Sequence, residues 1–116
     1  MILFSVGAKA ERAACRYLKR KGFRLLERNY RSGRHEIDLV MRDGDTVVFV
    51  EVKARSSADY GTPGEFVTPR KQRFLYLAAQ TYLKQNRLID EPARFDVIEV
   101  YLPNQDIVHI ADAFGT

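Results

Sequence analysis

The chain has 116 residues, of which 46% are hydrophobic and 29% charged, the balance of one soluble globular domain spanning residues 1–116 rather than of a disordered segment. Its single cysteine, Cys15, excludes an intramolecular disulfide and a cysteine-based zinc cage. No apolar run approaches the ~20 residues of a membrane span. The N-terminus lacks the cationic start of a signal peptide, so we expect a cytoplasmic protein without membrane contact.

Positive charge is concentrated in the first third of the chain. Residues 1–34 hold ten cations and two acids, a balance of +8, whereas the remaining residues balance to −4. A basic region on a small domain favours a polyanionic partner such as nucleic acid. A solvated helix face would produce the same pattern, and the charge alone does not separate the two interpretations.

The first half of the chain predicts one helix followed by three extended segments. Apolar residues recur at helical spacing over 7–21, and the segment 23–31 is extended. A strand over 36–41 and a returning strand over 46–54 are joined at Asp43-Gly44, a strong hairpin signal.

The second half predicts a polar loop, a helix and two strands. The loop covers 55–63, and the helix over 68–86 begins with Thr68 as its cap and proline in its first turn. Strands are expected over 94–101 and 107–110, with a turn at Pro103-Asn104 between them. The residues expected on the buried side of this helix are Phe74, Leu77, Ala78, Thr81 and Tyr82. The element order favours an α/β fold, a mixed parallel and antiparallel sheet with helices packed against it.

The hairpin groups charged side chains on one face. A two-residue loop at Asp43-Gly44 pairs Asp38 with Phe49 and Glu36 with Glu51. One face then carries only apolar residues and must be core: Ile37, Leu39, Met41, Val48, Val50 and Val52. The other face is charged at the end far from the turn, where its members are Glu36, Asp38, Glu51 and Lys53.

Like charges that face each other across strands are destabilising unless a cation lies between them. Oxygen ligands at this density suit Mg²⁺ or Mn²⁺ better than zinc, and Lys53 lies two residues from Glu51 on the same face. Ordinary solvent-exposed Glu–Lys pairs are the alternative. Glu11, the only acid in the first 26 residues, lies at the margin of the apolar stripe of the first helix and needs a partner. That partner is either an arginine of the same helix or the metal site.

These residues resemble a known signature. An acid in the first helix, Glu36-Ile37-Asp38-Leu39-Val40 and then Phe49-Val50-Glu51-Val52-Lys53-Ala54-Arg55 look like the PD-(D/E)XK nuclease pattern. Within that superfamily the chain is most similar to the small bacterial YraN family, which has no established activity. The residues that carry this likeness are Gly7, Glu11, Asn29-Tyr30-Arg31, Glu36-Ile37-Asp38-Leu39, Val50-Glu51-Val52-Lys53, Val67, Lys71, Ala79, Tyr82-Leu83 and Arg94-Phe95-Asp96-Val97.

The resemblance implies a restriction-endonuclease-like fold, similar to archaeal Holliday-junction resolvases, and Mg²⁺-dependent cutting of phosphodiesters. Carried over to this sequence, Asp38 and Glu51 are metal ligands together with the Val52 carbonyl. Glu11 completes the metal shell, and Lys53 is the catalytic lysine. Nucleic-acid contacts are expected from Arg12, Arg16, Lys19, Arg34, Arg55 and Lys71.

Other residues are interpreted as outside this site. His35 stands where the family usually has glycine, and it either shields the site, adds to it or is a neutral local change. His109 is expected to lie far from the motif, and Asp96 and Glu99 are expected to be solvated strand residues.

The leading hypothesis is a metal-dependent endonuclease acting on DNA of branched or irregular structure. Cutting both strands would call for a homodimer, because so small a domain contacts one strand at a time. The alternatives are a nucleic-acid-binding module that kept the fold without catalysis, and a protein adaptor whose basic face meets an acidic protein.

Overall fold

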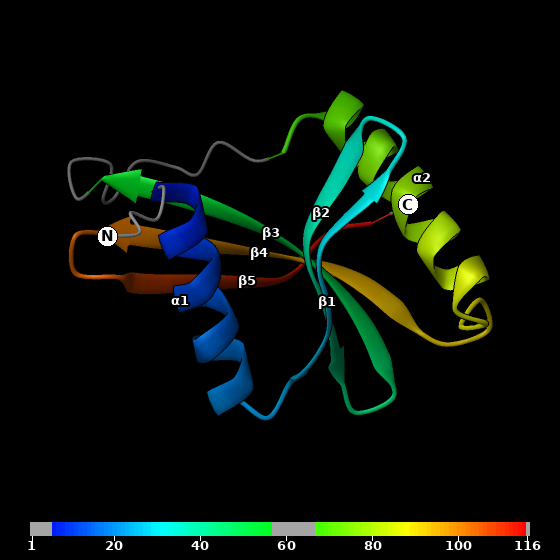
Figure 1. Cartoon of the computed structure of the whole chain (residues 1–116), viewed down its shortest axis with the longest axis horizontal. Coiled ribbons are helices and arrows are strands. Elements are labelled where there is room, and N and C mark those ends of the chain that lie inside the picture. The colour runs from blue at the N-terminus through cyan, green and yellow to red at the C-terminus, as the bar shows by residue number, and fades with distance from the viewer. Residues whose placement is uncertain (1–5, 57–66, 116) are drawn as a thin grey trace, which may run out of the picture.

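The computed structural model describes residues 6–56 and 67–115 (Figure 1). The order of elements is one helix, three strands, a second helix and two strands, as the sequence predicts. Their bounds are α1 (Val6–Arg20), β1 (Arg24–Ser32), β2 (His35–Asp43), β3 (Thr46–Ser56), α2 (Pro69–Gln85), β4 (Ala93–Leu102) and β5 (Asp106–Phe114). No helix among these residues has the length and apolar character needed to cross a membrane.

The five strands form one mixed sheet in the order β1-β2-β3-β4-β5. Neighbouring strands are antiparallel except for β3 and β4, which are parallel and are connected through α2. A parallel pair needs such a crossover because a tight turn cannot join strands that run in the same direction. The predicted α/β class, with a mixed sheet flanked by two helices, is therefore confirmed.

The two helices cover opposite faces of the sheet. Val47 and Phe49 belong to the apolar cluster under α2, whereas Val48 and Val50 belong to the cluster under α1. The predicted core face is confirmed for Leu39, Met41, Val48 and Val50, and the other face of β3 is buried as well near the turn. An uninterrupted apolar run such as 47–50 is typical of a strand covered on both sides.

Ile37 departs from the predicted alternation as well. It packs in the α2 cluster, although Leu39 and Met41 lie in the α1 cluster. The paired register between β2 and β3 ends at Leu39 and Val50. Ile37 lies beyond that point, where pairing with β3 no longer fixes which face a side chain takes.

The β2–β3 turn has two residues, but it lies one position later than predicted. Asp43 pairs with Thr46, which leaves Gly44 and Asp45 as the loop, and Gly44 takes a positive φ of 61° that favours glycine. Val40, not Asp38, therefore pairs with Phe49. The change moves the register by two residues, so over the paired residues 39–43 the even positions of β2 still share a face with the odd positions of β3.

The helix α2 begins where the sequence predicts, and Ala78 and Tyr82 are buried as predicted, but the buried side is rotated from the predicted one. The Thr68 side chain accepts a hydrogen bond from the Lys71 backbone N–H, and Pro69 occupies the first turn. The residues that this helix buries are Leu75, Ala78, Ala79, Tyr82 and Leu83. Leu77, predicted to be buried, is 56% exposed. The error arises because the helix carries two apolar sets at helical spacing, offset by one residue.

The prediction that Asp96 and Glu99 are solvated is wrong. Asp96 is fully buried and accepts hydrogen bonds from Arg94, His109 and the Asp112 backbone N–H. Glu99 is also buried and forms an ion pair with Arg55. For Asp96 the reason is the length of β5, which extends to Phe114 instead of ending at Ile110 and so places the Asp112 N–H against this carboxylate.

Candidate active site

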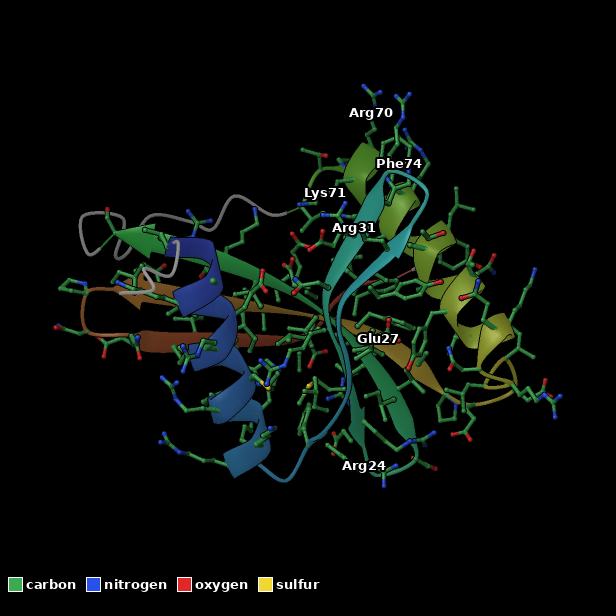
Figure 2. The ribbon with its side chains drawn as sticks, in the orientation of Figure 1. Arg24, Glu27, Arg31, Arg70, Lys71 and Phe74 are labelled. Carbon is green, nitrogen blue, oxygen red and sulfur yellow. The ribbon has the colours of Figure 1, made fainter. Side chains whose placement is uncertain are left out.

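A hollow of about 410 Å³ lies where the β1–β2 turn, β3 and the first half of α2 meet. Figure 2 places Arg70, Lys71 and Phe74 at the end of α2 that lies beside this turn. The residues that line the hollow are Arg34, His35, Glu36, Asp38, Glu51, Lys71, Phe74 and Leu75. Two of the predicted metal ligands and two of the predicted phosphate contacts therefore share one site.

Asp38 lies at the point where the β2–β3 ladder stops. Its Oδ2 accepts a hydrogen bond of 2.8 Å from the Val52 backbone N–H, so the carboxylate replaces a strand partner there. Burial and the negative charge of Glu51 raise the pKa of Asp38 to about 7, and Glu11 adds to the shift more weakly. The bond from Val52 and the charge of Lys71 act in the opposite direction. Asp38 is thus a carboxyl group whose surroundings disfavour its negative charge.

Glu51 is buried, and only one of its oxygens has a partner. Oε1 accepts a hydrogen bond of 2.7 Å from Nζ of Lys71, whose side chain is half exposed. Oε2 is buried, and among residues 6–56 and 67–115 it has no hydrogen-bond partner. A buried polar atom that lacks a partner costs free energy. The site therefore holds a carboxylate oxygen that a further cation or donor would stabilise.

Glu11 reaches the edge of the site through an amide. Nδ2 of Asn29 donates to Oε1 of Glu11 and to Oε1 of Glu36, at 2.9 Å in both cases. The hydrogen-bond partner of Glu11 is therefore Asn29 rather than an arginine of the same helix, and its place in a metal shell stays a prediction. Asn29 was quoted only as part of a motif, and its function as a bridge was missed. Its positive φ of 49° is a conformation in which asparagine is enriched.

Lys53 follows Glu51 on β3, two positions further along the strand, so the two side chains leave the same face. It is partly exposed. Its role as the catalytic lysine stays a prediction.

The predicted nucleic-acid contacts divide into separate groups. Arg34 and Lys71 line the hollow described above. Arg12 and Arg16 line another hollow beside the β4–β5 turn, and Lys19 is exposed on the same helix. Arg55 is paired with Glu99, and its side chain is only 14% exposed. The structure therefore brings two of these six cations to the acid pair.

The acid pair fits a divalent cation in part. Within residues 6–56 and 67–115, no three His, Cys, Asp or Glu side chains are grouped closely enough to hold a metal ion. Asp38 and Glu51 nevertheless repel each other, and Oε2 of Glu51 has no partner. Both features are costs that a hard cation with oxygen ligands would relieve. The donor set for such an ion is two carboxylates, with main-chain oxygen or water making up the rest.

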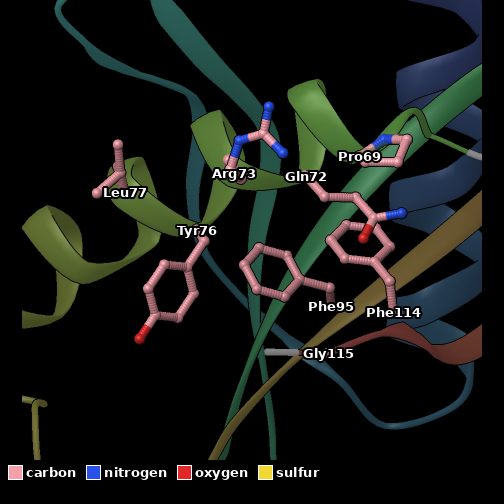
Figure 3. Close-up of a pocket in the computed structure, with 8 residues that line it drawn as sticks. All are labelled: Pro69, Gln72, Arg73, Tyr76, Leu77, Phe95, Phe114 and Gly115. Atoms are coloured by element: carbon pink, nitrogen blue, oxygen red, sulfur yellow. The ribbon is translucent and has the colours of Figure 1, made fainter.

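A second hollow, of about 510 Å³, lies on another side of α2 (Figure 3). It is lined by Pro69, Gln72, Arg73, Tyr76, Leu77, Phe95, Phe114 and Gly115. None of these side chains is an acid, so this mainly apolar hollow lacks the carboxylates that the acid pair offers to a hard cation.

Comparison with solved structures finds a distant similarity to Pyrococcus furiosus SfsA in complex with Ca²⁺. The identity is 14%, the TM-score is 0.39, and the match covers 90% of this chain and 61% of that chain. The present chain therefore spans less than two thirds of the length of that protein.

Comparison with protein families gives a more specific result. Residues 10–100 match the model of the uncharacterised protein family UPF0102. The chain is 49% identical over 112 residues to a UPF0102 protein of Geobacter metallireducens, covering 95% of this chain and 92% of the relative. It is 44% identical to a UPF0102 protein of Clostridioides difficile, covering 93% and 95%. The chain belongs to the UPF0102 family, which is the YraN family that its motifs indicated.

Proposed function

We propose that this chain is a metal-dependent endonuclease with a restriction-endonuclease-like fold, which hydrolyses phosphodiester bonds in DNA of branched or irregular structure. The observation that carries the proposal is the acid pair. Asp38 and Glu51 lie in one hollow, which Arg34 and Lys71 also line. Among the described residues, Oε2 of Glu51 has no hydrogen-bond partner. A fold keeps such an unfavourable arrangement when a ligand offsets its cost. The antiparallel hairpin followed by a helical crossover to a parallel strand supports the proposed fold.

The acid pair would hold Mg²⁺ or Mn²⁺, with the Val52 carbonyl as a main-chain ligand. When bound, such an ion supplies Lewis-acid stabilisation of charge on a phosphodiester and lowers the pKa of water. Glu11, held by Asn29, would orient water at the edge of the site. The Val52 backbone N–H already holds the Asp38 carboxylate in place.

The cations of the hollow would bind the phosphodiester itself. Lys71 pairs with Glu51, and its ammonium would bind a phosphate oxygen when Glu51 serves as a metal ligand instead. Arg34 lines the same hollow from the β1–β2 turn. Lys53 would stabilise the negative charge that develops as water adds to phosphorus and the P–O bond to the leaving oxygen breaks. A homodimer would be needed to cut both strands of a duplex.

The test is divalent-ion-dependent cleavage of labelled DNA: a four-way junction, a flap, a single strand and a duplex, with RNA for comparison. Each is incubated with Mg²⁺, Mn²⁺ or EDTA, beside the variant Lys53→Ala. The proposal expects cleavage that disappears in EDTA and falls by at least about a hundredfold in the variant. Equal cleavage by parent and variant would refute it and would reveal a contaminating nuclease.

A non-catalytic nucleic-acid-binding module is the second candidate. It is favoured by the ion pair between Lys71 and Glu51, which already neutralises part of the acid pair without a metal. This candidate expects salt-sensitive DNA binding that does not need Asp38, and no cleavage with either ion.

A further inference from the structure

We propose that the stacked rings of His35 and Phe74 form a binding site for an unpaired nucleobase of DNA, beside the acid pair. This inference rests on the proposed function of the same hollow, because it specifies which DNA the hollow accepts. It assigns a function to His35, whose role the sequence left open, and to Phe74, which the sequence placed in the core.

The two rings come from different elements and meet face to face. His35 is the first residue of β2, and Phe74 lies in the second turn of α2. Their centroids are 4.2 Å apart, with an angle of 14° between the planes. Each is partly exposed, and each lines the hollow that holds Asp38 and Glu51. An aromatic surface is therefore available next to the place where a phosphodiester would be cut.

Cationic side chains lie beside the ring pair, in a hollow that also holds the acids Glu36, Asp38 and Glu51. The Arg70 guanidinium lies 5.5 Å from the centroid of the Phe74 ring, and Arg34 and Lys71 line the hollow. The first turn of α2 contains no acid, although acids are the residues that the positive end of a helix favours. Sites that bind single-stranded nucleic acid usually combine cationic side chains with aromatic rings.

The geometry selects an unpaired base. A base within a duplex has its faces covered by its neighbours, so it can stack on a protein ring only after it leaves the helix. The hollow, at about 410 Å³, lies within the range of about 300–1,000 Å³ usual for small-ligand sites. The proposed nuclease would therefore prefer single strands, flaps and junctions that present an unpaired nucleotide.

The experiment compares two short strands of equal charge: a labelled DNA hexamer of thymidines, and a hexamer of abasic sites. Binding is measured by fluorescence anisotropy in EDTA, for the parent and for His35→Ala and Phe74→Leu. The matched control is Tyr76→Leu, which removes another partly exposed ring of α2 that lines the second hollow. Melting temperatures confirm that every variant is folded.

The parent is expected to bind the thymidine hexamer about tenfold more tightly than the abasic one, the effect of stacking one base. His35→Ala and Phe74→Leu should lose that difference, while Tyr76→Leu keeps it. Equal affinity of the parent for both strands, no binding of the thymidine hexamer, or a preference that survives both ring variants would overturn the inference. Since EDTA prevents metal-dependent cleavage, these outcomes are independent of the cleavage test above.

Discussion

The sheet contains buried acids in two regions, and the regions differ in whether the carboxylate oxygens have hydrogen-bond partners. On β4, Asp96 is fully buried, and both of its oxygens accept hydrogen bonds, from Arg94, His109 and the Asp112 N–H. On β3, Glu51 is buried too, yet its Oε2 has no partner and its neighbour Asp38 has a pKa raised to about 7. The first region is neutralised by the protein itself, and the second is left incomplete.

The difference separates a structural acid from a candidate catalytic one. A buried carboxylate with all its partners in place holds elements together, here linking β4 with β5 through His109. Nδ1 of His109 also lies 3.2 Å from Nζ of Lys21 at the end of α1. A buried carboxylate without all its partners costs stability in the protein alone and gains when a ligand arrives. Three predictions follow from this contrast, in order of the expected effect.

The largest effect on the free energy of unfolding is expected at Asp96, whose oxygens all have hydrogen-bond partners. Asp96→Ala should destabilise the fold by about 3–5 kcal/mol, since it leaves His109 and the Asp112 N–H without their buried partner. Urea denaturation followed by circular dichroism measures the free energy of unfolding. A loss below about 1 kcal/mol would mean that this network does not hold β5 to β4.

A substitution of Asp38 is expected to have the opposite effect and to stabilise the metal-free protein. The pKa of Asp38 is about 7 in the fold against an ordinary 3.8, so between these values the folded state binds a proton that the unfolded chain has released. Stability therefore falls as pH rises from about 4 to about 7, and the full cost is present above pH 7. Asp38→Asn should stabilise the protein by about 1–3 kcal/mol at pH 8.

The comparison is made in EDTA by urea denaturation at pH 8 and pH 4, with the parent measured in parallel. The gain should become small at pH 4, close to the ordinary pKa of 3.8, where Asp38 is protonated in the folded protein and about half protonated in the unfolded chain. A variant that is less stable than the parent at pH 8 would contradict the account of the acid pair.

A smaller effect is expected at Lys71, which occupies Oε1 of Glu51 at 2.7 Å. A divalent ion must compete with this ammonium, so Lys71→Met should tighten Mn²⁺ binding by about tenfold, or about 1.4 kcal/mol. The Mn²⁺ concentration that gives half of the maximal rise in melting temperature reports the affinity. Lys84→Met, at the other end of the same helix, is the matched control. Equal affinities for the two variants would show that Lys71 does not compete.

Local patterns of the sequence predicted much of the fold. The stripe of small residues on α1, the Thr68-Pro69 helix start and the glycine turn after β2 each act within a few residues, so their outcome does not depend on the rest of the chain. The buried side of α2 does depend on it, because two apolar sets compete and the sheet selects the one that contains Leu75. The same holds for Asp96, whose burial requires β5 to extend past His109.

The candidate site divides in the same way. The predicted hairpin put Asp38 and Glu51 on one face, and both line the same hollow although Asp38 lies beyond the last β2–β3 pair, Leu39 with Val50. Asn29 and Phe74 were not found, because their contacts with Glu11 and His35 join elements that are distant in sequence. No local pattern of charge or hydrophobicity reports such a contact.

The central claim is that the acid pair of Asp38 and Glu51 is a metal site, whereas Asp96, which is fully hydrogen-bonded, is not. Calorimetric titration of Mn²⁺ into the parent, Glu51→Gln and Asp96→Asn tests it most directly, at a temperature where all three are folded. The account predicts one Mn²⁺ per chain for the parent and for Asp96→Asn, and loss of binding in Glu51→Gln. Binding that Glu51→Gln retains at the affinity of the parent would contradict it.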